Sequence, residues 1–115
     1  MARVRVMYWK EIPVQVQAED GSGQVESPLD DRFQQGVDAI SMFDGSAGSD
    51  SYLMAWEWGE FVEAAGSAQK IADRLADRIN GSFPRDFVAR VRELHLSAER
   101  DPRLGALDGF FEDSG

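Results

Sequence analysis

The chain of 115 residues contains no cysteine and only one histidine. Without cysteine there can be no disulfide, no thiolate metal ligand and no cysteine nucleophile. A single histidine cannot supply a histidine-rich metal site. The composition therefore predicts a protein that has no metal and no cofactor, and the sequence offers no catalytic residues.

Positive charge is also scarce, because 12 Lys and Arg stand against 21 Asp and Glu, which gives a formal net charge of −9. Nucleic-acid binding and binding to anionic membranes both need clustered positive charge, so neither is expected. No apolar run approaches the roughly 20 residues of a membrane span, and no secretory signal is visible. We therefore expect a cytoplasmic protein.

Two stretches near the N-terminus alternate between apolar and polar side chains. This period of two is typical of β-strands, and the short link between the stretches predicts a β-hairpin. A third alternating run, over residues 52–62, predicts another strand. The side chains that should face a common core are Val4, Val6, Tyr8, Val14, Val16, Met54, Trp56 and Trp58.

Helical spacing follows in the rest of the chain. Ser27 and Pro28 are typical of a helix start, and Leu29, Phe33, Val37 and Ile40 then form one apolar stripe. A second helix should begin at the cap Ser67 and stop at Asn80-Gly81, and a third should cover about Pro84–Leu96. Residues 19–23 and 44–50 are rich in turn formers and are expected to be solvated loops.

These elements predict an α+β fold. We expect a two-layer sandwich in which a three-stranded antiparallel sheet, in the order ββαβα, carries its helices on one face. The right-handed rule for crossovers places the third strand beside the first. The domain should cover residues 1–97, and residues 98–115 should form an acidic tail.

The tail carries apolar residues at helical spacing, namely Leu104, Leu107 and Phe111. They predict a short helix, weakened by Gly105 and Gly109. Such a helix can dock on its own domain or in the groove of a partner, and the sequence leaves both alternatives open.

The face of the sheet opposite the helices is the expected contact surface. It should carry a patch of large apolar and polar side chains, and such patches are typical of protein interfaces. The alternative is that the third helix or the tail covers it. The residues predicted to bind a partner are Trp9, Lys10, Gln15, Gln17, Leu53 and Phe61.

A ligand or catalytic site is the competing interpretation. Glu60 falls beside Trp56 and Trp58 in the alternating run, and a carboxylate buried among aromatic rings is a candidate acid or base. The other interpretation is that the strand ends there and Glu60 reaches water. His95 stands alone and is expected on a helix surface.

Several stretches of the sequence occur in a specific succession. Residues 7–16 read MYWKEIPVQV, residues 29–33 read LDDRF, residues 50–53 read DSYL and residues 56–59 read WEWG. This succession, over about residues 3–80, resembles the small bacterial and archaeal "virulence factor" family. The resemblance implies no catalytic residues, because the family has no established activity.

The resemblance also implies an accessory role. In some larger proteins the domain resembles an insert, which points to an adaptor. Stand-alone members accompany corrinoid- and folate-dependent methyl-transfer enzymes. The leading hypothesis is therefore a non-catalytic protein-binding module, and the alternatives are a homodimeric structural module and a small-ligand or enzymatic site around Glu60.

Overall fold

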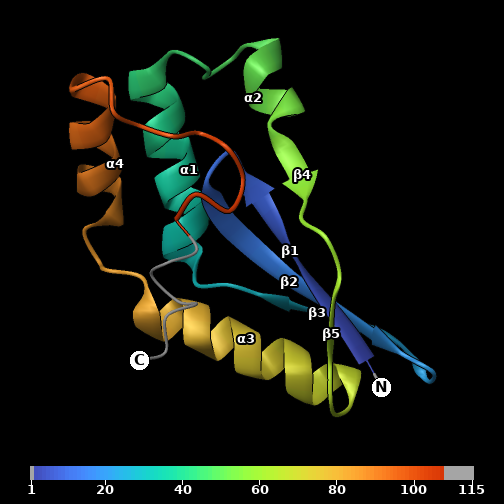
Figure 1. The fold of residues 1–115 in the computed structure, drawn as a ribbon. Coiled ribbons are helices and arrows are strands. Elements are labelled where there is room, and N and C mark those ends of the chain that lie inside the picture. Colours follow the sequence, from blue (N-terminus) through green and yellow to red (C-terminus); the bar gives the residue numbers. More distant parts are fainter. Residues whose placement is uncertain (1, 108–115) are drawn as a thin grey trace.

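The computed structural model describes residues 2–107 and contains five strands and four helices in that range (Figure 1). In chain order they are β1 (Ala2–Trp9), β2 (Ile12–Asp20), β3 (Gly23–Pro28), α1 (Asp31–Asp44), α2 (Asp50–Met54), β4 (Trp56–Trp58), β5 (Val62–Ala64), α3 (Ala68–Ser82) and α4 (Phe87–Leu96).

The strands form one antiparallel sheet in the order β3-β2-β1-β4, and β5 also pairs with β1. The predicted hairpin is β1 and β2, with Val4 opposite Ala18 and Val6 opposite Val16. The prediction that later strand residues lie beside the first strand is confirmed, because β4 and β5 both pair with β1. The α+β class is confirmed, but the sheet has five strands rather than three.

The prediction that a helix starts at Ser27 was wrong. Residues 23–28 form β3, which pairs with β2 from Gln15 to Asp20. Ser27 is buried and its hydroxyl donates to Asp73 at 3.0 Å, so it is not a helix cap. Helix α1 instead begins at Asp31. Pairing with β2 overrides the local start signal, and Pro28 is tolerated at the end of an edge strand.

The prediction of one strand over residues 52–62 was also wrong. Residues 50–54 form α2, and the strand pairing is split between β4 and β5. Between them the amide of Gly59 donates to the carbonyl of Val6 at 2.8 Å. A Cβ at position 59 would lie 3.1 Å from the ring of Tyr8, so glycine permits this close approach.

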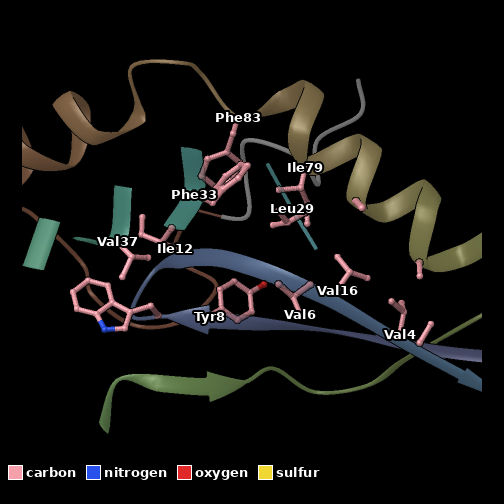
Figure 2. Close-up of a cluster of buried hydrophobic side chains, with 14 of the residues drawn as sticks. Val4, Val6, Tyr8, Ile12, Val16, Leu29, Phe33, Val37, Ile79 and Phe83 are labelled. Carbon is pink, nitrogen blue, oxygen red and sulfur yellow. The ribbon is translucent and has the colours of Figure 1, made fainter. Parts of the chain in front are cut away.

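Helices α1 and α3 cover one face of the sheet, and α4 packs beside α1 (Figure 1). Figure 2 shows the resulting core, in which side chains of β1 and β2 point toward the helices. The predicted helices over residues 67–81 and 84–96 are confirmed, although α3 continues through Asn80 and Gly81 to Ser82. The core side chains include Val4, Val6, Tyr8, Ile12, Val16, Phe33, Val37 and Ile79.

The prediction of which strand side chains face the helices is only partly confirmed. Val4, Val6, Tyr8 and Val16 are buried as expected, and Val14 and Trp56 pack against the core. Met54 is instead exposed on α2, and Trp58 pairs with Met7 and lies on the opposite face. Both errors follow from the break in the alternation at residues 50–55.

The expected helix in the tail is absent from the described part of the tail, where residues 104–107 form a turn. Leu107 packs against the core, and Leu104 is partly exposed. Phe111 lies outside the described residues. Residues 98–107 therefore lie against the domain without forming a helix.

The contact between α1 and α4 depends on Gly36. A Cβ built at this position would lie 2.5 Å from a ring atom of the buried Phe87. Phe87 in turn stacks on Phe33 with ring centroids 5.4 Å apart. This close approach fixes α4, and with it the start of the C-terminal segment.

We predict that Gly36→Ala lowers the free energy of unfolding by about 1–3 kcal/mol, because the added methyl group overpacks the α1–α4 contact. Gly81→Ala is the matched control, since it also lies in a helix but has nothing within 4 Å of its Cβ position. It should raise stability by up to about 1 kcal/mol. Urea denaturation measures both, and equal effects of the two substitutions would contradict the packing argument.

Candidate functional site

Trp9 does not lie on the open face of the sheet, as predicted, but is fully buried with 0% exposure. The pairing of β1 with β2 shifts register between Met7 and Tyr8, so the simple alternation ends there. As a result Tyr8 and Trp9 are both buried, and the indole Nε1 donates to the carbonyl of Tyr52 at 3.0 Å. Trp9 anchors α2 and offers no surface to a partner.

On the open face, polar side chains lie among the half-buried rings of Trp58 and Phe61. Arg5 donates to the side chain of Gln17 at 2.7 Å, and Gln15 and Gln17 both donate to Glu26. The guanidinium of Arg5 also lies 4.4 Å from the ring centroid of Phe61. Within residues 2–107, the contacts seen over these rings come from arginine side chains, through cation–π interactions.

The structure therefore separates the six predicted contact residues. Trp9 is in the core. Gln15, Gln17 and Phe61 lie on the open face, where Gln17 and Phe61 contact Arg5. Leu53 is exposed on α2, and Lys10 lies at the β1–β2 turn. Their role in binding stays a prediction, but they do not form one surface.

Glu60 and the two tryptophans are not brought together either. Glu60 is exposed and lines a cleft of about 630 Å³ with apolar walls that include Val4, Val62 and Leu75. Trp58 lies under the guanidinium of Arg5, and Trp56 packs edge-on against Tyr52. The aromatic pocket expected around this carboxylate is absent from the described residues.

A buried cluster of charged residues was missed by the sequence analysis. It lies at the two-residue turn between β1 and β2, where Lys10 has a left-handed backbone (φ 50°) and Glu11 is only 1% exposed. Asp44 comes from the end of α1, and Arg100 from the segment after α4. Figure 1 shows that segment, in orange to red, crossing α1 toward the end of β1.

The guanidinium of Arg100 donates hydrogen bonds to the carboxylates of both Glu11 and Asp44. Its Nε and Nη2 donate to the two oxygens of Glu11 at 2.6 and 2.7 Å, and its Nη1 donates to Asp44 at 2.9 Å. Lys10 donates to the same oxygen of Asp44 at 2.7 Å, and the amide and hydroxyl of Ser46 donate to the other oxygen. Bidentate pairing of this kind is strong and specific for arginine.

The surroundings shift the pKa of two of these groups. Burial raises the pKa of the Asp44 carboxyl, but hydrogen bonds from Lys10, Ser46 and Arg100 lower it more, and the net pKa lies well below the usual value. Burial lowers the pKa of the Arg100 guanidinium, but Glu11 and Asp44 raise it more. Both groups are therefore held in their charged forms.

An open pocket of about 400 Å³ adjoins the cluster and is lined by Lys10, Asp44, His95, Ala98 and Arg100, together with a proline. Ala98 also has a left-handed backbone (φ 61°). Within residues 2–107, these two are the non-glycine residues with positive φ, and both line this pocket. Such conformations cost free energy and tend to occur at functional sites.

Part of this site carried a signal in the sequence. Lys10 and Glu11 lie within the stretch MYWKEIPVQV on which the family resemblance rests. Arg100 lies 89 residues from Glu11, and nothing in the local pattern indicates that the two meet. Their pairing is a consequence of the fold.

Within the described range of residues 2–107, no group of three or more His, Asp or Glu side chains is placed to hold a metal ion. In the same range no helix is long and apolar enough to span a bilayer.

The chain was compared with known protein families. Residues 7–94 match the model of a family described as virulence factor. The chain belongs to the virulence factor family. The match runs past residue 80, where the resemblance ended, and includes most of α4, but it stops before Arg100. Comparison with curated proteins and with solved structures gave no match.

The depressed pKa of Asp44 predicts a pH dependence. A carboxyl whose pKa is lower in the folded state stabilises the fold above its unfolded pKa of about 3.9, and this contribution is lost as the pH falls below it. At neutral pH we expect Asp44→Asn to cost about 3 kcal/mol, because it removes one partner of a buried ion pair.

The stability difference between the native protein and Asp44→Asn should therefore shrink as the pH falls below about 4. Urea unfolding of both proteins over a series of pH values measures it. A difference that stays constant from about pH 6 to pH 2.5 would mean that the Asp44 carboxylate is not stabilised in the folded state.

Proposed function

We propose that this member of the virulence factor family is a non-catalytic accessory module that binds another protein through α2. The observation that carries this proposal is the exposure of its apolar side chains. Leu53 is 69% exposed and Met54 is 82% exposed, and no residue of α2 is buried. Large apolar side chains that are exposed side by side favour an interface.

No residue of helix α2 is buried, but the contacts of Tyr52 fix the position of the helix. The carbonyl of Tyr52 accepts a hydrogen bond from Trp9, and the Tyr52 ring packs against the rings of Trp9 and Trp56. The Tyr52 hydroxyl donates to Asp38 of α1 at 3.1 Å. A surface that is rigid before binding loses less entropy when a partner docks.

A third apolar side chain extends this surface. Met42 is 77% exposed and lies one helical turn after Asp38, so the two residues share a face of α1. Because Asp38 contacts Tyr52, Met42 lies on the side of α1 that α2 approaches. Methionine adapts to irregular partner surfaces, which suits this role. The contact surface is therefore Met42, Leu53 and Met54.

The composition supports a role without catalysis. There is no cysteine, and the ring of the single histidine, His95, packs 5.5 Å from the ring of Phe43. The family resemblance suggests the class of partner, namely corrinoid- and folate-dependent methyl-transfer enzymes. The location that follows for such a partner is the cytoplasm.

We expect the double substitution Leu53→Ser and Met54→Ser to weaken partner binding about tenfold or more, because exposed anchors of this size contribute about 1–2 kcal/mol each. Leu96→Ser with Val62→Ser is the matched control, since both residues are similarly exposed but lie outside α2. Co-purification from native cells, followed by calorimetry with the purified partner, measures the effect. Equal retention of the partner by both double variants would refute the contact surface.

The homodimer alternative predicts a different result. If Met42, Leu53 and Met54 bind a second copy, light scattering at micromolar concentration should give twice the monomer mass for the native protein. The Leu53→Ser and Met54→Ser variant should then return to the monomer mass. A native monomer removes this alternative and leaves binding to a different protein.

A further inference from the structure

The acceptors around Arg100 fit the shape of a guanidinium group. Glu11 presents both carboxylate oxygens to one edge of the group, and Asp44 accepts from the remaining nitrogen. The three distances lie between 2.6 and 2.9 Å, and the Arg100 side chain is only 7% exposed. A lysine ammonium cannot donate along two parallel directions in this way.

The backbone that carries the two acceptors is in place without Arg100. Asp44 ends α1 and is oriented by Lys10 and by the amide of Ser46. Glu11 is fixed by the tight turn between β1 and β2. Within residues 2–107, however, both hydrogen bonds that the Glu11 carboxylate accepts come from Arg100. Removal of Arg100 therefore leaves a formed but unsatisfied receptor.

The backbone of the segment that carries Arg100 is fixed at the end of α4, where the amides of Glu99 and Arg100 both donate to the carbonyl of Leu94. Ser97, Ala98 and Glu99 are exposed before Arg100, and Arg103 is exposed after it. Arg103 pairs with its neighbour Asp101 rather than with the domain. The guanidinium of Arg100 links this segment to the β1–β2 turn and to α1, and Leu104 and Leu107 contact the fold further along the chain. An ion pair of this kind can exchange its cation for another of the same shape.

We propose that Glu11 and Asp44 form a guanidinium-binding site, which Arg100 fills in this structure and which accepts an arginine side chain of a basic partner segment when Arg100 leaves. The net charge of −9 attracts a basic partner. Both acceptors belong to the matched family region, residues 7–94, whereas Arg100 comes from outside it. Binding at this site requires no contribution from the exposed side chains of α2.

The test is chemical complementation of the full-length Arg100→Ala variant. N-acetyl-arginine amide is the probe, and N-acetyl-lysine amide, which carries the same charge, is the control ligand. At about 10 mM the arginine amide should raise the melting temperature of Arg100→Ala, because a ligand that binds only the folded state stabilises it. The lysine amide should not. The native protein should bind the arginine amide at least about tenfold more weakly, because Arg100 must first be displaced.

A second variant ties the effect to the proposed acceptor. Arg100→Ala combined with Glu11→Gln should not respond to the arginine amide, because the bidentate carboxylate is gone. If Arg100→Ala is unfolded by itself, the arginine amide should refold it and the lysine amide should not. In the native protein, NMR should show that a large excess of arginine amide exposes the Arg100 Nε–H to exchange with water.

Three results would overturn the proposal. The first is an equal response of Arg100→Ala to the two amides, and the second is an unchanged response to the arginine amide in the double variant. The third is that the arginine amide neither refolds an unfolded Arg100→Ala variant nor displaces Arg100 in the native protein. Free L-arginine distinguishes two sources of the ligand. If the blocked amide binds at least as well as L-arginine, the ligand is a protein segment. If L-arginine binds more tightly, the same site takes the free amino acid.

Discussion

Two carboxylates buried at one end of the sheet constrain the fold more than any other feature. A buried ionised group is costly unless it is paired and hydrogen-bonded. Glu11 sits in the β1–β2 turn and Asp44 at the end of α1, so their pairing with Arg100 joins the start of the chain, its first helix and its C-terminal segment. The left-handed backbone of Lys10 and Ala98 is the local cost of bringing these side chains together.

Most of the elements could be predicted from the sequence because their patterns are local. Each pattern arises from the packing of one element against one neighbour. Examples are the alternation of Val4 with Val6, the cap at Ser67 and the apolar stripe that includes Ile71 and Ile79. The errors occur where a distant contact competes with the local pattern. Pairing with β2 draws Ser27 into a strand, and the bond from Trp9 holds Tyr52 in α2 instead of a continuous strand.

The candidate site was harder to predict for the same reason. The face assigned to Trp9 follows from strict alternation, and a single register shift after Met7 moves its ring into the core. The alternation of the first strand does not show that Arg3 and Arg5 contact the rings on the open face. In the fold their guanidinium groups lie over the ring of Phe61.

One of the two proposed surfaces is apolar and the other is charged. They would therefore contribute to partner binding in different ways. Helix α2 presents apolar side chains from a backbone that is already fixed, so its affinity comes from burial of area at low entropic cost. The Glu11–Asp44 site presents charge that is already paired, so it gains little net energy when one arginine replaces another. It selects instead by shape, because the acceptors are set for a planar fork. A partner that offers both an apolar patch and an arginine would therefore obtain affinity from the first and specificity from the second.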